Sequence, residues 1–155
     1  MVIIVTGNIN SYKTTKLVEL FGQVGGDGFV AVKKMIGDQV HSYNSIRLTT
    51  GESKLLVLRD EFAPNGFVKQ CQIGPYLFSK TTTMHIEAEI RKLIKQKKAP
   101  IFLDEIGVLE LSGQCFANIL TEMVESGLDL CLCMRKDVLQ QVITKFNIGE
   151  HIIIE

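Results

Sequence analysis

Short apolar runs alternate along the chain with amphipathic segments and glycine-rich breaks. Val2–Thr6 is a β-branched apolar run that ends at Gly7, which is typical of a buried parallel strand. A polar loop follows, and apolar side chains then recur at helical spacing from Leu17 to Phe21, which predicts a helix over residues 13–21. The glycine-rich stretch 22–28 ends this helix.

A different pattern follows from Phe29 to about Phe78. Short β-rich runs are separated there by Gly, Asp, Asn and Pro, which is typical of hairpins. The runs are Phe29–Ile36, Ser45–Thr49, Lys54–Leu58 and Phe67–Ile73. We interpret this hairpin-rich region as an insertion into a larger sheet, or as an antiparallel extension of it.

The second half of the chain alternates helices with short buried strands. The predicted helices cover Thr83–Lys97, a segment from the expected N-cap Ser112 to Ser126, and Lys136–Lys145. The predicted strands are Ile101–Leu103, Leu128–Met134 and His151–Ile154. This alternation predicts an α/β fold with a mainly parallel central sheet flanked by helices, in a single domain over residues 1–155.

Composition and charge restrict the partners. The 155 residues are 46% apolar and 22% charged, which suits one globular domain. Lys plus Arg equals Asp plus Glu at 17 each, so no overall field attracts nucleic acid or an anionic membrane. Membrane and nucleic-acid partners are therefore not expected, and any anion site must be local.

The four cysteines lead to an expectation about location. The chain opens directly into an apolar strand, without the pattern of a secretory signal, so we expect a cytoplasmic protein with reduced thiols. Cys131 and Cys133 lie two apart in an apolar run and would share one face of a strand. Packing is favoured there, because a metal site would need further thiolate or imidazole partners.

The polar loop after the first strand carries the first candidate chemistry. It reads Gly7-Asn8-Ile9-Asn10-Ser11-Tyr12-Lys13-Thr14, and Thr15 follows. The phosphate-loop pattern is G-x-x-x-x-G-K-[ST] between a strand and a helix, and only Tyr12 departs from it. In such a loop, backbone N–H groups hold phosphates, Lys13 would reach the β and γ phosphates, and the Thr14 hydroxyl would hold Mg²⁺. The alternative is an ordinary strand-to-helix turn that contains Lys-Thr.

Tyr12 occupies the position of the second glycine. The curvature of the loop favours a residue with positive φ at this position, where tyrosine is strained. We therefore expect a loop that is relaxed without nucleotide and whose ordering opposes binding.

An acidic pair forms the second motif. The apolar strand from Ala99 to Leu103 ends in Asp104 and Glu105. An acid at the end of a strand beside the phosphate loop can hold Mg²⁺, and we assign this role to Asp104, on a strand that neighbours the first. Glu105 would face the γ-phosphate and deprotonate the attacking water. Arg135, at the end of a later strand, either stabilises charge at this edge or is a solvated arginine that starts a helix.

The acidic strand and the segment after it, Leu103–Leu111, read LDEIGVLEL. This stretch resembles the DEIG-x-x-E-L signature of the small nucleoside-triphosphatase family of archaea, thermophilic bacteria and vertebrates, the cancer-related nucleoside-triphosphatases. Gly28–Lys33 and Ile73–Tyr76 resemble two further segments of that family. The resemblance implies a RecA-like P-loop fold that binds nucleoside triphosphates with Mg²⁺ and hydrolyses them slowly. It also implies phosphate binding by residues 7–14, with Asp104 on the metal and Glu105 catalytic.

We therefore expect a Mg²⁺-dependent nucleoside triphosphatase for ATP or GTP, with Lys13 and Glu105 catalytic, Thr14 and Asp104 on the metal, and Arg135 near the nucleotide. Two other classes stay open. A P-loop module that binds without hydrolysis is favoured by Tyr12. A nucleotide or small-molecule kinase is disfavoured, because four dispersed arginines do not suggest an arginine-rich lid.

Overall fold

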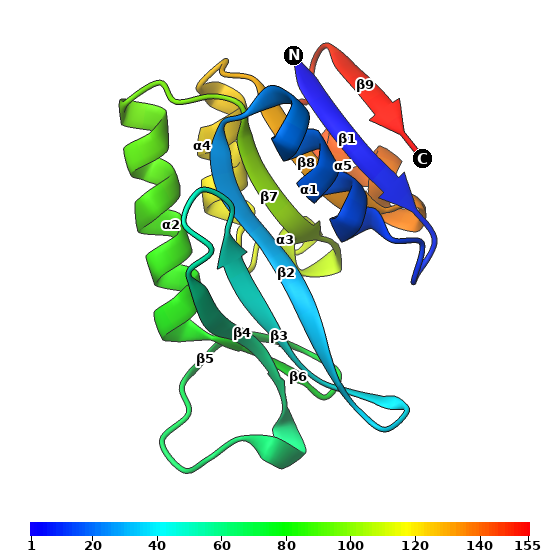
Figure 1. Cartoon of the computed structure of the whole chain (residues 1–155), viewed down its shortest axis with the longest axis vertical. Helices are drawn as coiled ribbons and strands as arrows, with labels where there is room; N and C mark the ends of the chain where they lie inside the picture. Colours follow the sequence, from blue (N-terminus) through cyan, green and yellow to red (C-terminus); the bar gives the residue numbers. More distant parts are fainter.

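The computed structural model describes residues 1–155 and contains one nine-stranded sheet, in the order β5-β6-β4-β3-β2-β7-β8-β1-β9 (Figure 1). The strands are β1 (Val2–Gly7), β2 (Asp27–Ile36), β3 (Gln39–Arg47), β4 (Ser53–Arg59), β5 (Lys69–Ile73), β6 (Tyr76–Ser79), β7 (Ile101–Ile106), β8 (Leu130–Arg135) and β9 (His151–Ile154). The helices are α1 (Lys13–Val24), α2 (Lys80–Lys95), α3 (Val108–Leu111), α4 (Ala117–Glu125) and α5 (Leu139–Lys145), with short 3₁₀ turns η1 (Asp60–Phe62) and η2 (Lys136–Val138).

The sheet has a parallel half and an antiparallel half. β2, β7, β8, β1 and β9 run parallel to one another. β2 then pairs antiparallel with β3, and the antiparallel pairing continues through β4, β6 and β5. The predicted α/β fold with a hairpin-rich extension is therefore confirmed. The extension continues the same sheet.

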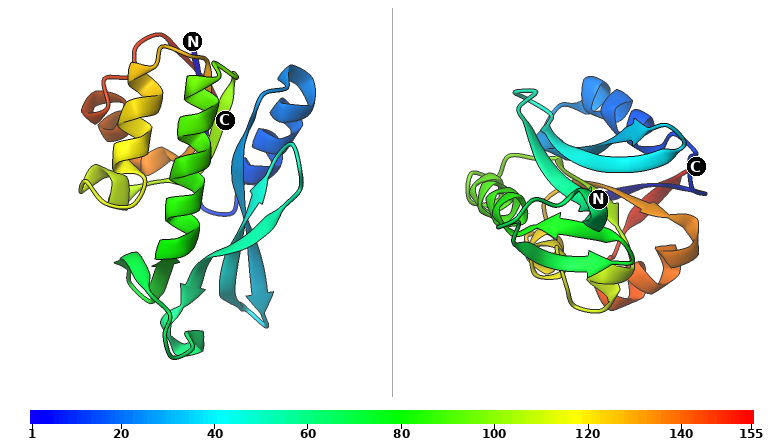
Figure 2. Two further views of the ribbon diagram at one scale, coloured as in Figure 1. Left: turned by 90° about the vertical axis from the view of Figure 1, so that its left-hand side faces the viewer. Right: turned by 90° about the horizontal axis from the view of Figure 1, so that it is seen from below.

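Helices cover the sheet on both faces, as the left view of Figure 2 shows for α1 on one side and α2 and α4 on the other, and α2 contacts β2 and the antiparallel strands β4, β5 and β6. Side chains of α2, α4 and α5 share the larger apolar core with β1, β7 and β8. Leu17 of α1 packs with a smaller cluster on the opposite face. Successive side chains of each strand point to opposite faces of the sheet, so the central parallel strands contribute to both cores. No helix of the structure is both long and apolar enough to cross a membrane.

Cys131 and Cys133 lie in the smaller cluster beneath α1 as free, buried thiols. Burial raises the pKa of Cys131 to about 12. Burial and the nearby Asp104 raise the pKa of Cys133 as well. Both side chains therefore stay uncharged and pack, as the sequence indicated.

The predicted helix from Ser112 to Ser126 is wrong at its start. α3 ends at Leu111 with Ser112 as its C-cap, and α4 begins at Ala117, after its N-cap Phe116. The buried carboxylate of Glu110 separates the two helices, because it accepts hydrogen bonds from the N–H groups of Gly107 (2.8 Å) and Phe116 (3.1 Å). These bonds hold the intervening turn against the sheet. Among the strands, β3 begins at Gln39, earlier than predicted, and β6 was not predicted.

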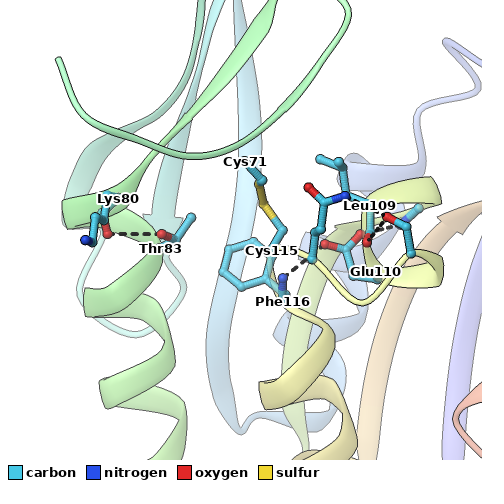
Figure 3. Close-up of a disulfide and its surroundings, with 10 residues drawn as sticks. Cys71, Lys80, Thr83, Leu109, Glu110, Cys115 and Phe116 are labelled. Carbon is cyan, nitrogen blue, oxygen red and sulfur yellow. Dashed lines mark hydrogen bonds between the residues drawn. A yellow bond between two sulfur atoms is a disulfide. The ribbon is translucent and has the colours of Figure 1, made fainter.

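A disulfide joins the antiparallel half to the turn before α4. Cys71 of β5 is bonded to Cys115, and their Cα atoms lie 5.9 Å apart, an ordinary distance for such a bond (Figure 3). The expectation that all four cysteines are reduced is therefore wrong for this pair. The sequence could not show the pairing, because the two residues are 44 positions apart and meet only through the fold.

This bond has a measurable contribution to stability. We expect the double variant Cys71→Ser/Cys115→Ser to lose about 3 kcal/mol of free energy of unfolding, because the bond restricts a long loop of the unfolded chain. Urea unfolding without reductant measures this, with the parent protein in dithiothreitol as the control. Thiol titration of the unfolded parent without reductant should detect only Cys131 and Cys133. Detection of all four cysteines would contradict the bond.

Candidate functional site

The candidate residues meet at the carboxyl ends of the central parallel strands. The phosphate-loop sequence follows β1, the acidic pair lies in β7, and Arg135 ends β8. β8 lies between β1 and β7, so the two motif strands are not neighbours, which corrects that expectation. They flank one shared strand, and Gly7 pairs in register with Arg135. Open α/β sheets bind their ligands at this edge.

The loop between β1 and α1 curls tightly over the helix start. Asn10 and Tyr12 both have positive φ, at 62° and 61°. A Cβ on Gly7 would collide with the Ser11 hydroxyl, so glycine allows the loop to fold this closely. The Ser11 oxygen is buried and has no hydrogen-bond partner within the protein. The loop ends at the N-terminus of α1, where backbone N–H groups without a partner inside the helix favour an anion.

Tyr12 is held in the left-handed conformation (φ 61°, ψ 32°) as the N-cap of α1. The structure confirms positive φ at this position. Whether the loop relaxes without nucleotide stays a prediction. The ring is 79% exposed, so it neither fills the loop nor packs on the hairpins.

The strain at Tyr12 should therefore appear in the stability of the fold. We expect Tyr12→Gly to raise the free energy of unfolding by about 1 kcal/mol, because glycine adopts positive φ without steric cost. The affinity for Mg²⁺–ATP should change little. Urea unfolding and calorimetric titration measure the two quantities, and Tyr12→Ala is the control that removes the ring but keeps the strain. A gain in affinity without a gain in stability would show that binding reorders the loop.

Two lysines contact the loop. Lys13 Nζ donates to the carbonyl oxygen of Asn8 at 2.7 Å. Lys33 Nζ, from β2, donates to Asn10 Oδ1 at 2.8 Å. Lys33 was not predicted as a site residue, because its position depends on how β2 passes the loop. The loop is thus bordered by two cations and, in the first turn of α1, by no acidic side chain.

Thr14 and Asp104 meet between α1 and β7. The Thr14 hydroxyl donates to Asp104 Oδ2 at 2.8 Å, and the same oxygen accepts from the N–H of Ala31 at 3.0 Å. The other oxygen, Oδ1, accepts from the N–H of Glu105 at 2.9 Å. Asp104 is only 4% exposed and forms no ion pair with Lys or Arg.

This donor set fits a hard cation. Two oxygens from different elements lie together, and one belongs to a buried carboxylate without a cationic partner. The chain has no group of three His, Cys, Asp or Glu side chains that could hold a metal by themselves. Mg²⁺ is usually held in this way, by one or two protein oxygens with phosphates and water completing its shell. The residues therefore fit Mg²⁺ bound together with a phosphate ligand.

Glu105 is directed out of the sheet by an irregularity in β7. The register between β7 and β8 shifts between Leu103 and Ile106, and Glu105 has φ 61°. Such bulges redirect side chains beside functional sites. The side chain reaches solvent, but its carboxyl is crowded by protein atoms. This desolvation, together with the charge of Asp104, raises its pKa to about 7. A carboxyl group with this pKa is suited to proton transfer near neutral pH.

A cavity of about 410 Å³ extends from these residues toward the antiparallel half. Lys13, Glu105 and Arg135 line its polar end, while the β5–β6 turn and α3 supply apolar walls. Arg135 also starts the 3₁₀ turn η2 and pairs with Asp137 at 3.1 Å. Arg135 therefore begins a helical turn and also lines the cavity. Its charge-stabilising role stays a prediction.

Residues 2–153 match the protein family described as NTPase. The chain belongs to this NTPase family. Two solved structures share its fold. THEP1 from the hyperthermophile Aquifex aeolicus has a TM-score of 0.71 and 20% identity, and the match covers 100% of this chain and 89% of that one. A human cancer-related nucleoside triphosphatase has a TM-score of 0.64 and 18% identity, and the match covers 99% of this chain and 87% of that one. No curated protein sequence matches the chain significantly.

Membership of the NTPase family confirms the resemblance seen in LDEIGVLEL and supports nucleotide binding. Within that signature the structure explains Glu110, which was not predicted as a site residue. Its carboxylate fixes the turn after β7, and burial raises its pKa to about 7 even though two N–H donors favour the charged form. The sequence signal that could have identified Glu110 is its place as the later glutamate of the DEIG-x-x-E-L stretch.

Proposed function

We propose that this protein binds nucleoside triphosphates with Mg²⁺ and hydrolyses them slowly to the diphosphate and phosphate. One observation carries the proposal: the Thr14 hydroxyl and the Asp104 carboxylate lie 2.8 Å apart at the start of α1, with Glu105 next in the chain. An anion-binding helix start, oxygen ligands for a cation and a proton acceptor are thus combined in one site. Positioning and charge stabilisation are what phosphoryl transfer to water requires.

Each residue then has a defined task. The N–H groups of residues 7–14 and of Thr15 hold the phosphates, and Lys13 leaves the Asn8 carbonyl to contact the β and γ phosphates. Thr14 and Asp104 would hold Mg²⁺, which would supply positive charge beside the phosphates. Glu105 takes the proton of the attacking water, and Arg135 faces the charge that develops on the γ-phosphoryl group.

The ligands that we propose are ATP and GTP, bound by one domain that comprises residues 1–155. A binding module without hydrolysis is the second candidate, and Tyr12 favours it. Its backbone keeps the left-handed conformation of that glycine, but its strained, exposed side chain departs from the glycine of an active phosphate loop.

Titration with Mg²⁺–ATP and Mg²⁺–GTP, followed by measurement of phosphate release, distinguishes these functions. Binding with release is the expected result. Binding without release would favour the second candidate, and no binding of either nucleotide would contradict both. Repeating the titration in EDTA tests the requirement for Mg²⁺, with loss of affinity as the expected result.

A further inference from the structure

The cavity beside Glu105 lies at one defined end of the proposed nucleotide site. Lys13 and Glu105 line it, whereas the loop residues 8–12 and Thr15 do not. In a phosphate loop the lysine reaches the β and γ phosphates, while the loop backbone holds the phosphates nearer the nucleoside. The cavity therefore opens at the γ-phosphoryl end. It is not the place where the nucleobase of the bound triphosphate lies.

The cavity is larger than hydrolysis requires. A water molecule occupies about 30 Å³ of liquid volume, and about 410 Å³ is within the usual range for small-molecule sites. Its walls are mostly apolar, with Val57 and Phe78 from the antiparallel half and Val108 and Leu109 from α3. A site that only positions an attacking water does not need such walls.

Two tyrosines form an aromatic wall of the cavity. The rings of Tyr43 and Tyr76 lie edge to face with centroids 6.4 Å apart, and the Arg59 guanidinium lies 5.7 Å from the Tyr76 ring. Burial, with the nearby charge of Glu105, raises the pKa of Tyr43 to about 12, so its hydroxyl stays neutral. Such a wall suits a flat ring, with a hydroxyl group available as a hydrogen-bond partner.

The charges around the cavity restrict the charge of its occupant. The only cationic side chains that line it are Lys13 and Arg135. Both are assigned to the triphosphate, Lys13 to its phosphates and Arg135 to the charge that develops on its γ-phosphoryl group. The other charged lining residues are the acids Glu105 and Glu110. No cation remains for a phosphate group on the second molecule, so an uncharged occupant is favoured over a nucleotide.

The walls of the cavity are also fixed in place. The Cys71–Cys115 bond joins β5 to the turn before α4, and Figure 3 shows it beside Phe116 and Glu110. Glu110 holds that turn through the N–H of Phe116. The wall from the antiparallel half and the wall from α3 are thus joined covalently, and a preformed pocket loses little entropy when it binds a ligand.

We propose that this cavity binds a nucleoside as a second substrate, and that the γ-phosphoryl group is transferred to its primary hydroxyl. A nucleoside combines a flat ring, no charge and a primary hydroxyl. The inference rests on the proposed triphosphate site. The hydroxyl oxygen forms a bond to the γ-phosphorus, and the bond from that phosphorus to the β,γ-bridging oxygen breaks. The electron pair stays on the diphosphate, and Glu105 takes the hydroxyl proton and later releases it to solvent.

The test uses [γ-³²P]ATP with Mg²⁺ and four probes: adenosine, cytidine, guanosine and thymidine. Labelled nucleoside monophosphate is separated from labelled free phosphate, and the corresponding 5′-monophosphates are tested in parallel. We expect transfer to at least one nucleoside and to none of the monophosphates. Transfer to no nucleoside, or equal transfer to monophosphates, would overturn the inference. If ATP binds and phosphate is released without transfer, only this inference fails; if ATP does not bind, the proposed function fails.

A pair of matched variants locates the site. Val108 on α3 lines the cavity and is 41% exposed, whereas Val18 on α1 is 43% exposed and does not line it. Val108→Trp should lower the ratio of nucleoside monophosphate to free phosphate by about tenfold or more, because its side chain fills the pocket. Val18→Trp should leave the ratio unchanged. Equal ratios in the two variants would show that transfer does not use this cavity.

Discussion

The variant Lys13→Ala is expected to bind Mg²⁺–ATP about a hundredfold more weakly than the parent, because it loses charge-assisted hydrogen bonds to the phosphates. The fold should be nearly unaffected. Lys13 Nζ makes one hydrogen bond within the protein, at the surface, to the carbonyl of Asn8. Calorimetric titration measures the affinity and thermal unfolding measures the stability.

Lys16→Ala is the matched control for this prediction. Lys16 lies one turn further along α1 and is half-buried like Lys13, but no phosphate contact is assigned to it. Its removal should change the affinity by less than about threefold, as expected for a screened surface charge. Equal losses in both variants would mean that α1 contributes only general positive charge. An unchanged affinity in Lys13→Ala would contradict the assignment of the phosphate loop.

Substitutions of the two acidic residues should have different effects on nucleotide affinity and on turnover. We expect Glu105→Gln to bind Mg²⁺–ATP as the parent does but to release phosphate about a hundredfold more slowly, because the proton acceptor is lost. Asp104→Asn should weaken Mg²⁺-dependent binding and lower turnover together. It removes the charge that holds the cation and disturbs the hydrogen bonds to Thr14 and Ala31.

Kinetics of phosphate release and titration of Mg²⁺ at fixed ATP measure these effects. Urea unfolding of both variants controls for loss of structure, which is a concern for the buried Asp104 and not for the exposed side chain of Glu105. Small and equal effects of the two substitutions would show that the pair only terminates β7.

The parts of the site that are local in sequence were predictable. The phosphate loop and the acidic pair are contiguous motifs, each placed by one apolar strand, and hydrophobic periodicity is sufficient to identify such strands. The left-handed backbone at Tyr12 followed from the glycine that the motif requires there, and the structure has φ 61°. Whether the loop relaxes without nucleotide does not follow from the motif, and it stays a prediction.

The parts that depend on distant pairing were not predictable. β8 separates β1 from β7, and nothing in the apolar pattern of three similar strands specifies their order. The cavity gathers Lys13, Tyr43, Tyr76 and Glu105 from four different elements. The break at Ser112 depends on a buried glutamate that captures backbone N–H groups on both sides of the turn. Such bonds override local helix propensity and appear only once the chain is folded.

A single-turnover measurement tests the central claim most directly. The parent and Glu105→Gln, each in excess over [γ-³²P]ATP with Mg²⁺, are mixed with the nucleotide and quenched over time. The parent should convert all bound label to free phosphate. Glu105→Gln should release phosphate about a hundredfold more slowly, so that most of the bound label stays as intact ATP over the same time. Equal release by both proteins, or no release by the parent despite binding, would contradict hydrolysis at this site.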